Sequence, residues 1–80
     1  MITLQIEYFA TLREQAGQSR QTLDTELRDA RAVYALLANE HQFSLGVDDL
    51  KLAVNDRFAD WSHTLNDGDR LVFIPPVSGG

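Results

Sequence analysis

Apolar and polar residues alternate from Ile2 to Tyr8, which is the pattern of a β-strand with one buried face. Residues 20–27 carry a second pattern of this kind. Between them, residues 10–17 predict a short helical turn that Gly17 is suited to end, because glycine adopts the left-handed conformation at low cost. The connection is short, so we expect the two strands to form an antiparallel pair.

A helix is the clearest element of the chain. Asp29 stands where an N-cap belongs, since its carboxylate can accept hydrogen bonds from the free amides of the first turn. The next residues place apolar side chains at i, i+3, i+4 and i+7, which is one stripe of a helix that runs to about Glu40. That stripe consists of Ala30, Val33, Tyr34 and Leu37, and we expect Leu36 to widen it. Beyond the helix, residues 41–49 predict an irregular stretch.

Three further strands are predicted in the second half of the chain, over residues 50–54, 57–59 and 71–74. The pair at residues 55–56 is a turn signal, and so is the run Asn-Asp-Gly-Asp at residues 66–69. The order is therefore β-β-α-β-β-β, without repeats or linkers.

This order predicts an α+β domain with two layers, because one helix can cover only one face of a sheet. We expect a mixed sheet of about five strands, one main helix and a short helical turn, with the first and last strands side by side in the middle. This arrangement is the ubiquitin-like β-grasp. The other face of the sheet should stay uncovered, and we expect Phe9 and alternate residues of the last strand to lie on it.

The last residues have a different character, and we divide the chain into a domain over residues 1–74 and a flexible tail over residues 75–80. Pro75 and Pro76 stop the preceding strand and hold the chain extended, since each ring fixes φ and removes a backbone donor. Val77 and Ser78 follow, and Gly79 and Gly80 bring a carboxylate to the end of a stem without side chains. A frayed terminus is the alternative interpretation.

Charge and composition exclude several classes of function. The net charge of −5 argues against nucleic acid as a partner, because its phosphates would be repelled. No apolar stretch approaches the roughly 20 residues of a membrane helix, and no basic region with a long apolar stretch opens the chain. The chain has no cysteine, which fits a reducing compartment. We therefore expect a cytoplasmic protein that acts at no membrane.

The side chains offer little chemistry of their own. The five glycines form no phosphate-binding loop, and the two histidines, His41 and His63, lack a ligand set at metal spacing. We expect no bound cofactor and no metal, and a chain that is not catalytic alone. The carboxylate of Gly80 remains, and it reacts only after activation, for which an acyl-adenylate made at the cost of ATP is suitable. Another protein has to supply that step.

Several segments resemble the small subunits of molybdopterin synthase, and they span the whole chain in order. These segments are Tyr8-Phe9-Ala10-Thr11-Leu12-Arg13-Glu14 with Gly17, then Ala53-Val54-Asn55, then Leu65-Asn66-Asp67-Gly68-Asp69, and finally Phe73-Ile74-Pro75-Pro76-Val77-Ser78-Gly79-Gly80. The tail and the Asn-Asp-Gly-Asp turn are the specific part. The chain departs from the family at Ile74, where members often carry an aromatic residue.

The resemblance implies a ubiquitin-like sulfur carrier. In that family an adenylating enzyme of the ubiquitin-activating type uses ATP and magnesium to activate the last glycine, here Gly80, and sulfur derived from a cysteine desulfurase makes a thiocarboxylate. The tail, here residues 75–79, inserts into the large subunit and delivers sulfur to the pterin precursor, which forms the molybdopterin dithiolene. Two copies of each subunit form the synthase. The interface residues implied are Phe9, Arg13 and Ile74.

Three alternatives stay open. A sulfur carrier for the thiamine thiazole has the same fold and the same Gly-Gly end, although such carriers are usually shorter and lack the Phe-x-Pro-Pro lead into the tail. A ubiquitin-like protein modifier would form isopeptide bonds through the same carboxylate. A plain interaction module is the third alternative.

Overall fold

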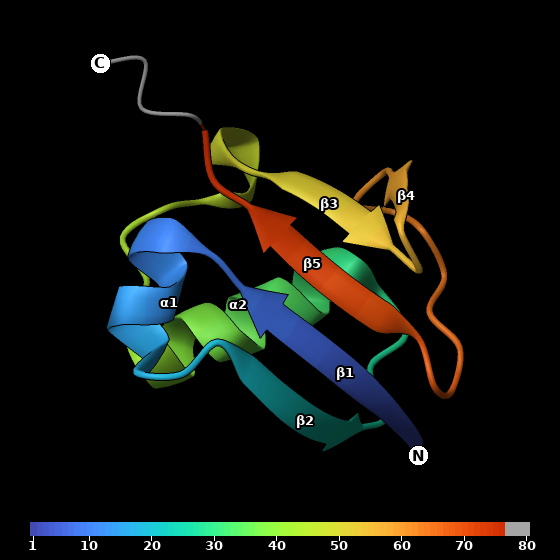
Figure 1. Cartoon of the computed structure of the whole chain (residues 1–80). Helices are drawn as coiled ribbons and strands as arrows, with labels where there is room; N and C mark the ends of the chain where they lie inside the picture. Colours follow the sequence, from blue (N-terminus) through green and yellow to red (C-terminus); the bar gives the residue numbers. More distant parts are fainter. Residues whose placement is uncertain (77–80) are drawn as a thin grey trace.

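The structure, a computed structural model, describes residues 1–76, and these residues form one mixed sheet with two α-helices on one side of it (Figure 1). The elements in chain order are β1 (Ile2–Tyr8), α1 (Ala10–Ala16), β2 (Arg20–Thr25), α2 (Ala30–His41), the 3-10 helix η1 (Val47–Asp49), β3 (Lys51–Val54), β4 (Arg57–Ala59) and β5 (Arg70–Ile74). None of the helices in this part of the chain is long and apolar enough to cross a membrane.

The strand order β2-β1-β5-β3-β4 confirms the predicted β-grasp. β1 and β5 run parallel in the middle of the sheet, where Tyr8 is opposite Phe73, and every other strand pair is antiparallel. A parallel pair needs a long crossover, and here the segment between β1 and β5 contains α2 and supplies it. Because β1 and β5 run in the same direction, their C-terminal residues lie at the same edge of the sheet.

The core lies between the sheet and α2, and it is built from alternate strand positions and one helical stripe. Tyr8, Leu37 and Phe73 are almost completely buried. Aromatic rings pack there edge to face, with ring centroids 5.0 Å apart for Tyr34 and Phe73. The predicted stripe of α2 is confirmed as the buried face of that helix, except that Leu36 is exposed and does not widen it. The buried residues of α2 are Ala30, Val33, Tyr34 and Leu37.

The N-terminus of α2 is capped as the sequence predicts. Asp29 Oδ1 accepts from the backbone N–H of Arg31 at 2.7 Å and of Ala32 at 3.2 Å. These bonds satisfy two donors that have no partner inside the helix. At the other end, Gln42 adopts a left-handed conformation with φ of 58° and closes the helix.

The predicted end of the second strand was wrong. β2 ends at Thr25, because the Thr25 hydroxyl accepts from the Leu27 N–H at 3.1 Å and the chain turns there, which leaves Leu27 exposed. The helical turn predicted over residues 10–17 is a seven-residue α-helix that Gly17 ends with φ of 74°. The stretch predicted to be irregular contains η1.

A small polar network holds the β3–β4 hairpin against the start of β5. Asn55 Nδ2 donates to Asp69 Oδ1 at 2.9 Å, and Asn55 Oδ1 accepts from the Arg70 N–H at 2.9 Å. The buried Asp69 also accepts from the Asn66 N–H at 2.8 Å. Hydrogen bonds therefore join the turn that begins at Asn55 to the turn that begins 11 residues later, at Asn66. These bonds fix the hairpin relative to the sheet.

Candidate functional site

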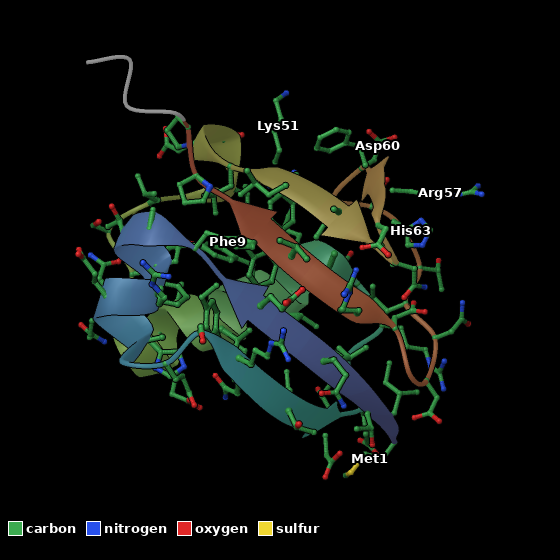
Figure 2. All side chains as sticks on the ribbon, viewed as in Figure 1. Met1, Phe9, Lys51, Arg57, Asp60 and His63 are labelled. Carbon is green, nitrogen blue, oxygen red and sulfur yellow. The ribbon has the colours of Figure 1, made fainter. Side chains whose placement is uncertain are left out.

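The face of the sheet away from the helices carries an apolar patch, which we define as Phe9, Ala53, Phe58, Val72 and Ile74. Tyr8 and Phe73 face the core, so the next residue of each segment, Phe9 and Ile74, falls on the opposite face. Ala53 and Phe58 reach the same face because they are cross-strand partners in the β3–β4 hairpin. Figure 2 shows Phe9 where β1 ends, beside β5.

The apolar patch lines a shallow hollow of about 330 Å³. Two of its members are large and well exposed, since Phe58 keeps 75% and Phe9 keeps 47% of its surface accessible. Exposed aromatic side chains that gather around one hollow usually mark an interaction surface. The patch is therefore the clearest binding surface among residues 1–76.

Charged side chains surround the patch and pair with one another. Glu7 lies between two arginines, with Arg20 Nε at 3.5 Å and Arg70 Nε at 3.7 Å from its carboxylate oxygens, and Arg70 also pairs with Asp56. These pairs are partly exposed, so each contributes little to stability. The two acidic and the two basic side chains of these pairs have formal charges that sum to zero beside the apolar patch.

The root of the tail lies beside the patch. β5 leads directly into Pro75 and Pro76, and the first of these is half-buried. A second hollow, of about 250 Å³, is lined by both prolines together with Asp48, Asp49, Leu50, Lys51 and Ile74. Ile74 lines both hollows, so the tail root and the apolar patch form one continuous surface.

The structure brings together two of the three predicted interface residues. Phe9 and Ile74 line the same hollow, as predicted for the uncovered face. Arg13 is an exposed residue of α1 and does not line that hollow, and its role stays a prediction. Among the predicted tail residues, Pro75 and Pro76 are described, whereas Val77, Ser78, Gly79 and Gly80 lie outside the described residues.

Sequence reasoning missed Phe58, which is the most exposed member of the patch. Its signal was present, because the two-residue turn at positions 55–56 sets the hairpin register and places Phe58 opposite Ala53. That register also places Val54 opposite Arg57 on the other face. Counting outward from the turn would have found this residue.

The buried polar groups belong to the core. Tyr8 Oη donates to Gln21 Oε1 at 2.7 Å, and Tyr34 Oη donates to the Leu45 carbonyl at 2.6 Å. Burial raises the pKa of Tyr34 to about 12, with a further contribution from Asp49, and burial raises the pKa of Tyr8 still higher. Both phenols are thus neutral hydrogen-bond donors at physiological pH. Within residues 1–76, no three side chains of histidine, cysteine or acid gather as metal ligands would.

Comparison with known proteins gives a consistent result. The model of the ThiS family matches residues 6–80. A relative from Escherichia coli K12, named "Molybdopterin synthase sulfur carrier subunit", is 31% identical over 80 residues, which cover 96% of this chain and 99% of the relative.

Solved structures agree with the fold. The putative molybdopterin converting factor subunit 1 from Pyrococcus furiosus superimposes with a TM-score of 0.79 at 29% identity, over 96% of this chain and 100% of that one. The crystal structure of SAMP1 from Haloferax volcanii gives a TM-score of 0.81 at 25% identity, over 98% of this chain and 99% of that one. A related structure from the same organism is titled small archaeal modifier protein 1.

Proposed function

This chain belongs to the ThiS family, and from that premise we propose that it is the sulfur carrier subunit of a molybdopterin synthase. The observation that carries the proposal is the match to the carrier subunit from Escherichia coli over nearly the full length of both chains. The alternative carrier for the thiamine thiazole has weaker support, because that relative is named for molybdopterin synthesis.

The proposed chemistry takes place at the carboxylate of Gly80. An adenylating enzyme of the ubiquitin-activating type joins this carboxylate to the AMP part of ATP, with pyrophosphate as the leaving group and magnesium as the cofactor of that enzyme. A sulfur nucleophile, supplied indirectly by a cysteine desulfurase, then displaces AMP and leaves a thiocarboxylate. Two such transfers, from two thiocarboxylated chains, place two sulfur atoms on a pterin precursor on the large subunit and form the dithiolene. Water restores the carboxylate of each chain.

The described residues support this proposal through the position of the tail root. A partner that covers Phe9, Phe58 and Ile74 meets Pro75 at the rim of the same surface. The two prolines keep the start of the stem extended, because their rings fix φ. Docking on the apolar patch therefore directs the tail toward the partner, and we assign the patch to contact with the large subunit.

A second candidate function is protein modification, which the similarity to SAMP1 favours. The same activated carboxylate would then react with a lysine amine and form an isopeptide bond. The two functions differ in their products, since a carrier releases sulfur whereas a modifier stays attached to its target.

The test is a synthase reconstituted from the thiocarboxylated chain, the large subunit and the pterin precursor. The intact chain should support molybdopterin formation, and a chain that lacks Gly80 should not, although both should melt at the same temperature. Gly79→Val should also impair transfer, because the branched side chain of valine makes the stem too wide for a narrow passage in the partner. Gly79→Ala, which adds only one methyl group, is the milder matched control. Full activity of the chain without Gly80 would overturn the proposal.

A further inference from the structure

β4 is an edge strand of the sheet, and its outer side is unpaired within residues 1–76. The strand order ends with β4, and its three residues pair only with β3. An unpaired edge presents backbone N–H and C=O groups that another extended chain can bind. The local geometry identifies which backbone groups of β4 point outward.

The turn before β4 sets that geometry. Asn55 and Asp56 have φ of 52° and 70°, the positive values that a two-residue type I′ hairpin turn requires. In such a hairpin the residues that flank the turn, Val54 and Arg57, form a hydrogen-bonded pair, and the next pair is not hydrogen-bonded. That next pair contains Phe58. Its N–H and C=O therefore point away from β3, toward the free edge.

Phe58 lines three hollows around β4. One is the hollow of the apolar patch. Another, of about 460 Å³, extends toward Lys51 and Trp61. The last, of about 700 Å³, lies on the opposite face and is lined by Arg57 and His63. Successive side chains of a strand point to opposite faces. A strand added beside Phe58 would thus place its side chains into hollows on both faces.

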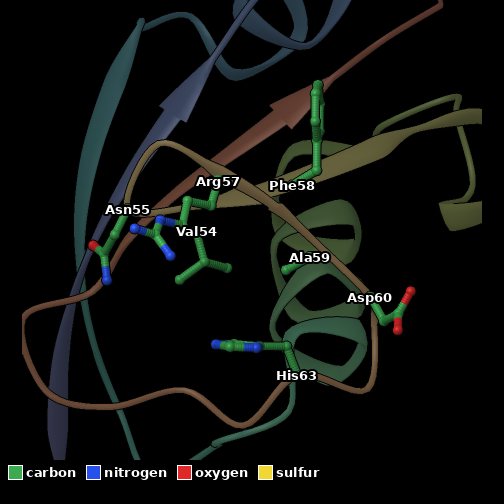
Figure 3. Close-up of a pocket in the computed structure, with 7 residues that line it drawn as sticks. All are labelled: Val54, Asn55, Arg57, Phe58, Ala59, Asp60 and His63. Atoms are coloured by element: carbon green, nitrogen blue, oxygen red, sulfur yellow. The ribbon is translucent and has the colours of Figure 1, made fainter.

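The largest of these three hollows carries two basic side chains that have no partner among residues 1–76. Figure 3 shows Arg57 and His63 on two sides of this hollow, with the Asp60 carboxylate directed away from it. Neither Arg57 nor His63 forms an ion pair or a side-chain hydrogen bond with any residue in the range 1–76. In a chain with a net charge of −5, two unpaired basic side chains around one hollow favour an acidic ligand.

We propose that the free edge of β4 binds an extended, acidic segment of a partner protein by strand addition. The segment exchanges two backbone hydrogen bonds with Phe58 and places one carboxylate between Arg57 and His63. This binding mode differs from the proposed contact with the large subunit, because its backbone hydrogen bonds use the edge of β4 and its carboxylate enters the hollow opposite the apolar patch. Phe58 is shared by the two surfaces, so the test separates its backbone from its side chain.

The experiment titrates the ¹⁵N-labelled chain with the acetylated, amidated hexapeptide TVEVTV and follows amide shifts and hydrogen exchange. The Phe58 amide should shift downfield and exchange more slowly. The matched peptide TVKVTV should bind at least about fivefold more weakly, and Arg57→Gln should weaken binding of TVEVTV by about the same factor, which is the value of one partly exposed ion pair.

Phe58→Pro is the decisive variant when compared with Phe58→Ala, because both remove the aromatic ring but only proline also removes the N–H that points outward, and neither change removes a bond of β4 to β3. Phe58→Pro should abolish the titration shifts, whereas Phe58→Ala should keep them in weakened form. Unchanged binding by folded Phe58→Pro, equal binding of the two peptides, or no binding of TVEVTV would overturn the proposal. If Phe58→Pro does not fold, the shift and exchange of the wild-type Phe58 amide decide the question, and their absence contradicts it.

Discussion

The two faces of this sheet are built from the same strands, but the helices cover one face and leave the other exposed. Tyr8 and Phe73 face the helices and are almost completely buried, while their chain neighbours Phe9 and Ile74 face outward at the rim of a hollow. Because side chains alternate along a strand, one residue step separates a position that determines stability from a position that is available for binding. In a chain of 80 residues, this alternation provides a core and a docking surface from a single sheet.

The faces also differ in how they treat polar groups. On the covered face, the phenols of Tyr8 and Tyr34 are buried and each donates a short hydrogen bond. On the open face, the charges of Glu7 and Arg70 are paired in partial contact with water. Substitutions on the covered face should therefore alter the stability of the fold, whereas substitutions on the open face should alter association with a partner.

The largest expected effect is on the covered face. Phe73→Ala should lower the free energy of unfolding by about 3–5 kcal/mol, because it leaves a cavity among rings that cannot easily close. A small domain has only about 5–15 kcal/mol in all, so this variant should be partly or fully unfolded. Ile74→Ala should cost less than about 1.5 kcal/mol. Urea denaturation followed by circular dichroism measures both.

The pair of variants serves as its own control, since the two residues are adjacent in β5. Equal losses of stability would contradict the difference between the two faces, because they would place Ile74 in the core.

The second effect, on the open face, concerns binding. Phe9→Asp should weaken association with the large subunit by at least about thirtyfold, the loss typical of a charge placed at an interface anchor, while the melting temperature barely changes. Isothermal titration and thermal melting measure the two quantities. Leu36→Asp is the matched control, because Leu36 is exposed on α2, away from the apolar patch. A large fall in stability for Phe9→Asp would contradict the account.

The third and smallest effect is a pH dependence that belongs to the covered face. Tyrosine in the unfolded chain ionises near pH 10, whereas burial raises the pKa of Tyr34 to about 12 and that of Tyr8 further. The folded state therefore holds more protons above about pH 10, and stability that is fully present below that pH is lost as the pH rises. Urea midpoints measured from about pH 9 to 11 should fall.

Tyr34→Phe sharpens this prediction. The variant should be less stable at neutral pH by about 1 kcal/mol, because it loses the hydrogen bond to the Leu45 carbonyl. Its stability should also fall less steeply above about pH 10, since one ionising phenol is gone. An identical slope for both proteins would show that Tyr34 ionises equally in the two states.

Local signals predicted the elements and the layers of the fold. The alternation in β1, the Asp29 cap and the stripe of α2 are each contained within a few residues, and all three were confirmed. The end of β2 was predicted wrongly because the hydrogen bond from Leu27 to Thr25 competes with the strand pattern. The 3-10 helix η1 was missed for a similar reason, since its single turn has no periodicity of its own.

The candidate site was predicted only in part. Phe9 followed from the expectation of one uncovered face, which is a property of the fold class, whereas Ile74 came from the resemblance to the small subunits of molybdopterin synthase. Phe58 and Ala53 join them through the register of the β3–β4 hairpin, and the tie between Asn55 and Asp69 holds that hairpin in place. The register of this hairpin could have been derived from its local turn, but the pairing of β3 with β5 and the tie to Asp69 are long-range contacts that no local pattern of the sequence contains.

The most direct test of sulfur carriage is the intact mass of the chain after incubation with ATP, magnesium, the activating enzyme and a sulfur source. The account predicts a single heavier species that differs by the exchange of one oxygen for sulfur. That species should be absent without ATP, because an unactivated carboxylate does not exchange with sulfide at neutral pH. Isopeptide adducts of high mass without any thiocarboxylate would contradict the account and identify the chain as a protein modifier.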